Sequence, residues 1–177
     1  MENTEKKVGM LQPLITYGLI LSLGLIIHSI VNYVLDIYDP GILNKLLSWV
    51  IVGGLIFFGQ YKYRNDYKGG YITYGQSLGF GVLMGVVAAV VSTLFFIVLI
   101  KVIDTGYMDR IMQTAEEQMY QKGMPEEQIA MGIGIAKKMM LIILPIGTVF
   151  ISLIVSLITS IFVKKAESPF GKDEFNG

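Results

Sequence analysis

The chain has 177 residues, of which 53% are hydrophobic and 16% are charged, and its formal net charge is zero. Soluble domains usually carry about 25% charged residues, so the composition argues against a water-soluble domain. The sequence contains no cysteine, which excludes disulfide bonds and thiolate chemistry. It has no basic stripe, which argues against nucleic acid as a partner.

Four uncharged stretches account for the low charge. They contain 28, 16, 32 and 25 residues, and basic or acidic residues bound each of them. A helix needs about 20 apolar residues to cross the hydrocarbon core of a membrane. The sequence therefore predicts an all-α bundle of four transmembrane helices, at about residues 12–36, 42–60, 74–103 and 139–163. We expect residues 1–163 to form a single membrane domain and residues 164–177 to form a disordered tail.

The first predicted span contains the only histidine of the chain. His28, Asn32 and Asp36 follow one another at intervals of four residues, which places them on one face of a helix. A polar side chain at membrane depth needs a partner, and a neighbouring helix or water is the simplest one. A ligand or proton site is the alternative. One histidine and one asparagine are too few ligands for a metal, and we expect no metal and no cofactor.

An elbow with the sequence YRNDYKGGYITYGQSLGFG, residues 63–81, joins the second and third spans. Its tyrosines and basic residues are typical of a membrane–water interface. Gly69 and Gly70 permit a tight turn with positive φ, while Thr73 and Gln76 have the spacing of a capping box. We therefore expect the elbow to turn the chain and to begin the third span. The alternative is a pocket for a lipid headgroup or another ligand at Gly69, Gly70 and Gln76.

Small residues recur along the third span. Gly75 and Gly79, and then Gly81 and Gly85, are each separated by three residues, and Ser92 continues the seam. This spacing lets the backbones of two helices approach closely. The spacing predicts packing of this helix against another span or another subunit. We expect the lipid bilayer as one partner of the chain, and a second copy or another membrane protein as a further partner through this helix.

The long connection between the third and fourth spans, residues 104–138, predicts an amphipathic helical hairpin. Gly123 suits the end of one helix, and Pro125 with the two following glutamates suits the first turn of the next. Two arrangements are open for this hairpin: it lies on the surface of the bilayer, or it extends the third and fourth spans beyond the bilayer. Asp104 is placed to pair with Lys101. In the first half of the predicted hairpin, apolar residues recur at helical spacing: Met108, Ile111, Met112, Ala115 and Met119.

The fourth span combines a proline with a polar seam. Pro145 removes a backbone hydrogen bond and predicts a kink. The hydroxyls that follow predict hydrogen bonds across helices: Ser152, Ser156, Thr159 and Ser160. No Asp, Glu, Lys or Arg lies within the four uncharged stretches. Ion-coupled transporters usually need such a group at depth, so a coupled transporter is disfavoured.

Lysine and arginine are distributed unevenly between the two sides of the predicted bundle. With both termini in the cytoplasm, eight basic residues lie inside and six outside. This bias favours a multi-pass inner-membrane protein with both termini cytoplasmic. The six outer residues are Lys45, Lys101, Arg110, Lys122, Lys137 and Lys138.

Three segments together resemble the bacterial domain-of-unknown-function family 4199, found mainly in Bacteroidota. They are the elbow, the segment KVIDTGYMDRI at 101–111 and the segment GMPEEQI at 123–129. Met124 departs from the Ser or Thr cap expected at that place. The resemblance implies an inner-membrane protein of about this length with spans placed as here. It implies no activity and no catalytic residues.

Three functional hypotheses are compatible with this pattern. The leading one is a non-enzymatic accessory or envelope-associated component that acts through helix packing. The second is a small permease or channel for a neutral solute, with His28, Asn32 and the serine seam along its path. The third is a protein that handles lipid headgroups at the elbow, which lacks a nucleophile–base pair.

Overall fold

The computed structural model of the chain describes residues 9–38 and 41–166, and its regular structure is helical. The predicted all-α bundle, with a helical hairpin between its third and fourth long helices, is confirmed. Residues 167–177 of the predicted disordered tail lie outside the described residues. The elements in order are α1 (Leu11–Val34), α2 (Ile42–Lys62), η1 (Tyr63–Tyr67), α3 (Tyr74–Val98), η2 (Leu99–Ile103), α4 (Tyr107–Gln121) and α5 (Glu126–Val163).

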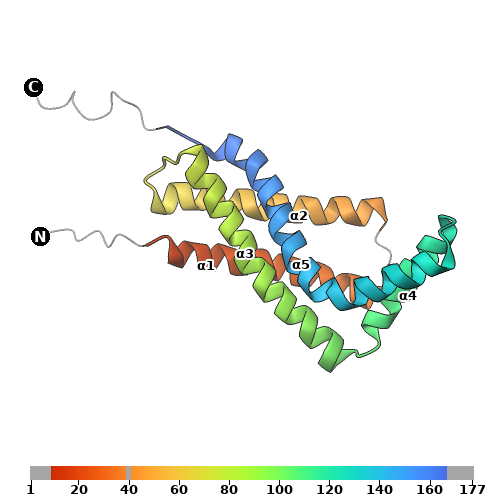
Figure 1. The fold of residues 1–177 in the computed structure, drawn as a ribbon. Helices are drawn as coiled ribbons and strands as arrows, with labels where there is room; N and C mark the ends of the chain where they lie inside the picture. The colour runs from red at the N-terminus through yellow and green to blue at the C-terminus, as the bar shows by residue number, and fades with distance from the viewer. Residues whose placement is uncertain (1–8, 39–40, 167–177) are drawn as a thin grey trace, which may run out of the picture.

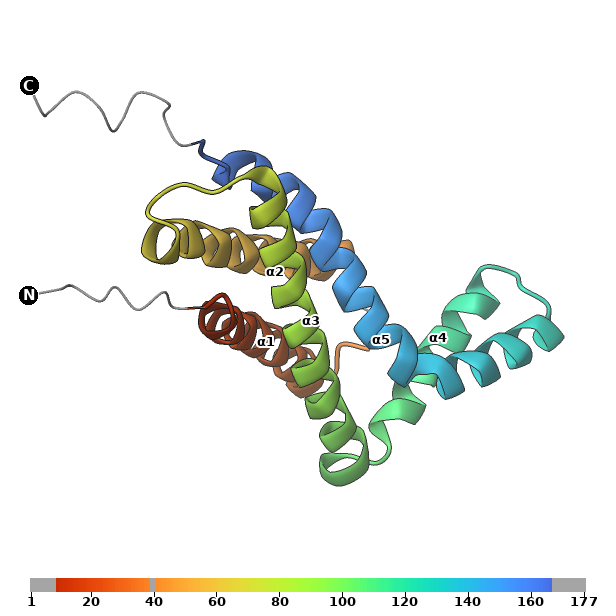
Figure 2. The same ribbon diagram turned by 60° about the vertical axis from the view of Figure 1, so that its left-hand side comes forward.

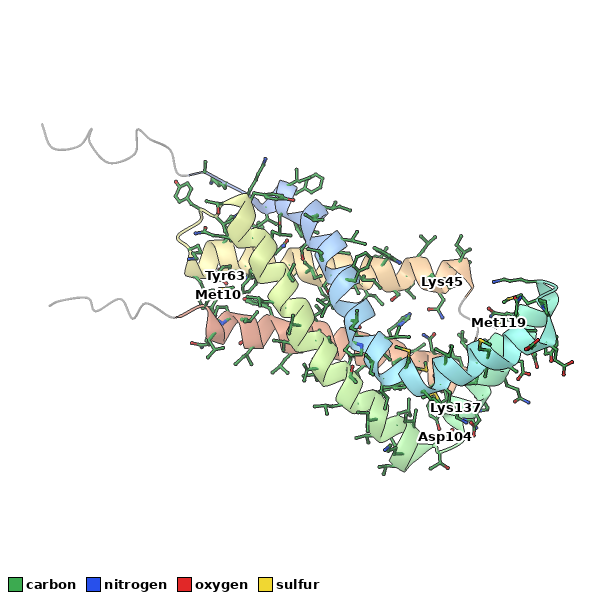
Figure 3. All side chains as sticks on the ribbon, in the orientation of Figure 1. Met10, Lys45, Tyr63, Asp104, Met119 and Lys137 are labelled. Carbon is green, nitrogen blue, oxygen red and sulfur yellow. The ribbon has the colours of Figure 1, made fainter. Side chains whose placement is uncertain are left out.

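The four long helices run alternately in opposite directions (Figure 1). The helix α3 packs against α1 and α5, and α2 packs against the same two helices from the other side. The elbow lies at one end of the bundle and the hairpin at the other. Figure 3 shows this arrangement, with Met10 and Tyr63 at the elbow end and Asp104, Met119 and Lys137 at the hairpin end.

The outer surface of the bundle is apolar. Leu23, Val50, Ile146 and Phe150 are each more than half exposed, as are many other large hydrophobic residues of the four long helices. Exposed apolar patches of this extent mark a surface that contacts membrane or protein. All four helices are long and apolar enough to cross a membrane, which is compatible with a multi-pass membrane protein.

The centre of the bundle is formed by interlocking aromatic, aliphatic and small residues. Phe80 of α3 is fully buried and stacks on the Tyr63 ring, with the ring centroids 4.0 Å apart. Leu21, Ile56 and Met84 are also fully buried around it. Close packing of this kind makes the interior sensitive to changes of side-chain volume.

The hairpin consists of α4 and the first half of α5. Gly123 ends α4 with a φ of 72°, and the Met124 N–H donates to the Met119 carbonyl over 3.2 Å, which is the Schellman pattern. The helix α5 begins at Glu126, so Pro125 is its N-cap residue and not part of its first turn. From there α5 continues without interruption into the long helix of the bundle. The Lys137 ammonium of α5 forms an ion pair with the Asp109 carboxylate of α4, with 2.5 Å between Nζ and Oδ1.

Pro145 lies inside α5, which remains helical on both sides of it. A proline removes one backbone hydrogen bond and its ring clashes with the carbonyl four residues earlier. Figure 2 shows α5 bending between its turquoise N-terminal part and its blue C-terminal part. The bend directs the hairpin away from the axis of the bundle.

Candidate functional site

Three polar side chains form a closed ring between α1 and α2. The His28 Nε2 lies 2.7 Å from Asn44 Oδ1, the Asn44 amide donates to Asn32 Oδ1 over 2.6 Å, and Asn32 Nδ2 lies 3.4 Å from His28 Nδ1. Because an amide oxygen only accepts hydrogen bonds, His28 donates from Nε2 and accepts at Nδ1. The ring gives both imidazole nitrogens of His28 a hydrogen-bond partner without any ligand. Asp36 is outside it and accepts from the Tyr38 hydroxyl over 2.7 Å.

The elbow turns the chain as its sequence predicts. Gly69 and Gly70 have φ values of 63° and 87°, which other residues rarely adopt. The predicted capping box of α3 is formed, because the Gln76 N–H donates to Thr73 Oγ1 and the Thr73 N–H donates to Gln76 Oε1. A ligand-binding role for Gly69, Gly70 and Gln76 stays a prediction.

The elbow also fastens the end of α5 to the rest of the bundle. Arg64 of the π-helical turn η1 donates from Nη1 to the Val163 carbonyl over 2.9 Å. Ile72 and Lys165 exchange two backbone hydrogen bonds of 3.0 Å each. These contacts satisfy groups that a helix end otherwise leaves unpaired.

An open cavity of about 320 Å³ lies beside this junction. Lys68 and Lys165 line it, together with Tyr71, Thr73 and Gln76. The Lys165 ammonium lies 5.4 Å from the centroid of the Tyr71 ring. Two cations beside the N-terminus of α3 make this part of the elbow electropositive.

The two glycine pairs of α3 have different surroundings. A Cβ atom at Gly81 would lie 2.3 Å from Ser156 Oγ, and one at Gly85 would lie 2.3 Å from Ser152 Cβ. A Cβ atom at Gly75 or Gly79 would meet no atom of residues 9–38 or 41–166 within 4 Å. The inner pair therefore lets α3 contact α5, and the outer pair faces open space. Ser92 donates to the Ala88 carbonyl over 2.7 Å and stays within its own helix.

A buried polar cluster joins α2, α3 and α5 near the elbow. Gln60, Ser77, Ser156 and Ser160 are completely buried. The Gln60 Nε2 donates to the Ser77 carbonyl over 3.0 Å and to Ser160 Oγ over 3.1 Å. The cluster contains no ionisable side chain, so it offers hydrogen bonds but no net charge.

A charged and aromatic network closes the hairpin end. Asp104 accepts hydrogen bonds from Arg110, from the Tyr33 hydroxyl over 3.2 Å and from the Gly106 N–H over 3.1 Å. Arg110 also donates to the Tyr38 hydroxyl over 2.9 Å. The predicted pairing of Asp104 with Lys101 is wrong. The π-helical turn η2 ends α3 immediately before Asp104, and the first turn of α4 brings Arg110 to the carboxylate instead.

We predict that this network holds α4 in place down to about pH 4. The Arg110 hydrogen bond lowers the pKa of Asp104 below its usual value, which is about 3.9 in an unfolded chain. A lowered carboxyl pKa stabilises the folded state above the unfolded pKa, and this stabilisation is lost as the pH falls through the lower, folded pKa. Spin labels at Leu35→Cys and Gln113→Cys would report the distance from α1 to α4.

That distance should stay constant from pH 7 to about 4 and broaden below it. Asp104→Asn should broaden it at pH 7, whereas the control Lys101→Gln should leave it unchanged. A distance distribution that Asp104→Asn leaves unchanged at pH 7 would contradict a role for the ionised Asp104.

Comparison with known families identifies the chain. A family model described as "Protein of unknown function (DUF4199)" matches residues 16–165. The chain belongs to the DUF4199 family. No curated protein and no solved structure matches it. The matched region of this DUF4199 chain includes the elbow, both glycine pairs and the hairpin.

Sequence reasoning missed several residues that the fold of this DUF4199 chain brings together. Asn44 had no special pattern, yet it completes the ring with His28 and Asn32. Gln60 lies only at the edge of an uncharged stretch, yet it is fully buried. A spacing of four residues could have placed Asn44 and Ser48 on one face of α2, but Gln60 lies about 160° from Asn44 around the same helix, so no spacing links them. Among the described residues no group of three or more potential metal-ligating residues occurs.

Proposed function

We propose that this DUF4199 protein is a multi-pass protein of a bacterial inner membrane that acts without catalysis, by packing α3 against a second copy of the chain. The observation that carries the proposal is the open face of α3 at Gly75 and Gly79. Exposed glycines four residues apart allow like helices to approach closely in a membrane. The face has no charge, so two copies would not repel each other.

An apolar groove continues this face toward the hairpin and supports the same proposal. The groove, of about 470 Å³, lies between α3 and α5 and is lined by Val82, Val86, Val90, Ile146 and Phe150 among others. Gly79 and Val86 are seven residues apart, two turns of one helix face. A partner helix that crosses at the glycines could bury side chains in this groove.

The elbow end is placed in the cytoplasm in this proposal. Lys62, Arg64 and Lys68 lie at the start of the elbow, and Lys164 and Lys165 follow α5 at the same end, where Lys165 pairs with Ile72. Cytoplasmic loops carry an excess of such residues. Labelling of single cysteines with a membrane-impermeant reagent on intact cells would test the orientation. Lys122→Cys should be labelled, and Lys68→Cys should be labelled only after the membrane is opened.

Cysteine cross-linking in native membranes tests the packing of α3. The chain has no cysteine of its own, so Gly79→Cys introduces a single thiol. We expect a disulfide-linked dimer on oxidation, because close approach at Gly79 brings the two thiols together. Leu19→Cys, on the exposed face of α1, is the control and should remain monomeric. A Gly79→Cys variant that cross-links no more than this control, or only to another protein, would contradict packing between two copies.

A second candidate function is the passage of a small neutral solute, which the uncharged polar groups inside the bundle favour. Neither the ring of His28, Asn32 and Asn44 near the hairpin end nor the Gln60 cluster near the elbow contains an Asp, Glu, Lys or Arg side chain. We expect His28→Leu to reduce solute flux into proteoliposomes, because the ring loses two of its hydrogen bonds. Leu23→Ala, on the exposed face of α1, is the control. Equal flux through wild type and His28→Leu would count against this candidate.

A further inference from the structure

The Gln60 cluster contains hydrogen-bonding capacity that the protein itself leaves unused. The side chain of Gln60 is completely buried, and its amide nitrogen uses both protons on the Ser77 carbonyl and Ser160 Oγ. Its Oε1 atom has no partner among the described residues. The opposite amide orientation would place Oε1 against the Ser77 carbonyl, where two acceptors would repel. The unpaired oxygen is therefore a consequence of the fold.

Two serine hydroxyls of the cluster are also unpaired. The Oγ atoms of Ser77 and Ser156 are buried without a partner in the described part of the chain. Serine and threonine in a helix usually satisfy their hydroxyl on the carbonyl four residues earlier. Thr148, Ser152 and Thr159 of α5 do so, at 2.8–3.1 Å. Ser156 stands between them and does not.

The side chains of Ser156 and Gln60 approach each other beside Gly81. Ser156 Oγ and Gln60 Nε2 lie 2.3 Å and 2.5 Å from the position that a Cβ atom at Gly81 would occupy. Ser77 is held in the cluster through its own carbonyl, which accepts from Gln60. The three residues with unpaired atoms, Gln60, Ser77 and Ser156, thus belong to one cluster, which contains both unused acceptors and unused donors. Buried polar atoms without partners destabilise a fold, and proteins commonly satisfy them with a bound molecule such as water.

A polar seam leads from this cluster toward the hairpin end. On α5 it passes from Ser156 to Ser152, one turn away, and Ser152 lines a cavity of about 150 Å³ with Ser48 and Thr148. Ser48 is one turn of α2 from Asn44, a member of the His28 ring. The two ends of the seam, Gln60 and Asn44, are 16 residues apart on α2, or about 24 Å along the helix, and between Gln60 and Ser48 the seam runs on α5.

We propose that the Gln60 cluster is a binding site for a small neutral molecule that both donates and accepts hydrogen bonds, namely water or a short polyol. The bound molecule donates to Gln60 Oε1 and accepts from the hydroxyls of Ser77 and Ser156. The cavity at Ser48, Thr148 and Ser152 is the next polar position along the seam. The site does not depend on packing between two copies, and it gives the second candidate function its binding residues.

The stability of Ser156→Ala in detergent tests whether the site is occupied. If a molecule is bound, the variant loses a hydrogen bond to it, and we expect the Tm to fall by about 2–4 °C. Ser77→Ala should behave in the same way. Ser92→Ala is the control, because the Ser92 hydroxyl is satisfied within α3. An unchanged or raised Tm for both Ser77→Ala and Ser156→Ala would mean that the cluster is dry and would overturn the proposal.

Added glycerol distinguishes the two occupants. If a polyol binds, glycerol should raise the Tm of wild type more than that of Gln60→Leu, which keeps the side-chain size and removes Oε1. If glycerol raises the Tm of both proteins equally, while Ser77→Ala and Ser156→Ala still lower the Tm, the occupant is water. Osmotic shrinkage of proteoliposomes then tests passage separately. An occupied site without flux would contradict the second candidate function and leave the binding site standing.

Discussion

Gly85→Ala should destabilise the bundle by about 1–3 kcal/mol, the usual cost of overpacking an interior. The new Cβ atom would lie 2.3 Å from Ser152 Cβ, an atom that no rotation of the serine side chain can move. Relief therefore requires α3 and α5 to separate along their contact. Gly81→Ala meets only the side-chain atoms of Ser156 and Gln60 within 3 Å, so a smaller loss is expected there.

Gly79→Ala is the matched control on the same helix. No atom in the described part of the chain lies within 4 Å of the added Cβ, and alanine is favoured over glycine within a helix by about 1 kcal/mol. We expect this variant to be neutral or slightly more stable when unfolding is followed by circular dichroism in detergent. The assignment of the inner and outer faces of α3 would be wrong if Gly79→Ala and Gly85→Ala lost the same stability.

Phe80→Ala should be the most damaging single truncation, at about 3 kcal/mol. Phe80 is completely buried and stacks on Tyr63 of η1, so its loss removes the contact between α3 and the π-helical turn that begins the elbow. In a membrane the transfer of apolar surface from water contributes little, because lipid is as apolar as the core. The expected loss therefore comes from the cavity, and lies at the lower end of the range for Phe→Ala.

Phe150→Ala is the comparison for this truncation. Phe150 is 60% exposed on the outer surface of α5, so its removal leaves no internal cavity. Thermal unfolding of the two variants in the same detergent should separate them by several degrees. Similar Tm values would mean that Phe80 does not form the centre of the bundle.

The sequence predicted the helices well because each signal was local. Four uncharged stretches gave α1, α2, α3 and α5, and the capping residues Thr73 and Gln76 gave the start of α3. Gly123 gave the end of α4 in the same way. Each of these features depends on residues within one or two turns of one another, which a single sequence contains.

The pairing of residues between helices was harder to predict. Periodicity assigns faces along one helix, but it does not say which neighbour each face meets. The two glycine pairs of α3 have the same spacing, yet Gly79 and Gly81 are two residues and about 200° apart, so the pairs point to nearly opposite sides. The ring partner Asn44 and the Arg110–Asp104 contact likewise arise from tertiary packing. The π-helical turns η1 and η2 gave no sequence signal.

The two proposals use different surfaces of one bundle. The packing proposal uses the outer face of α3 at Gly75 and Gly79, and the binding-site proposal uses the interior around Gln60. Both proposals require lipid around the apolar exterior. Lipid cannot form hydrogen bonds with the unpaired polar atoms of the interior, so those atoms need a bound molecule. A variant at one surface should leave the assay for the other unchanged.

The fluorescence of Trp49, the only tryptophan, tests that dependence most directly. Trp49 is 43% exposed on α2, two turns from its start at Ile42. In liposomes that contain lipids with brominated acyl chains, we expect strong quenching of its emission, with little further quenching by iodide in the water. Emission that brominated lipids leave unchanged and that iodide quenches would contradict a membrane-spanning bundle.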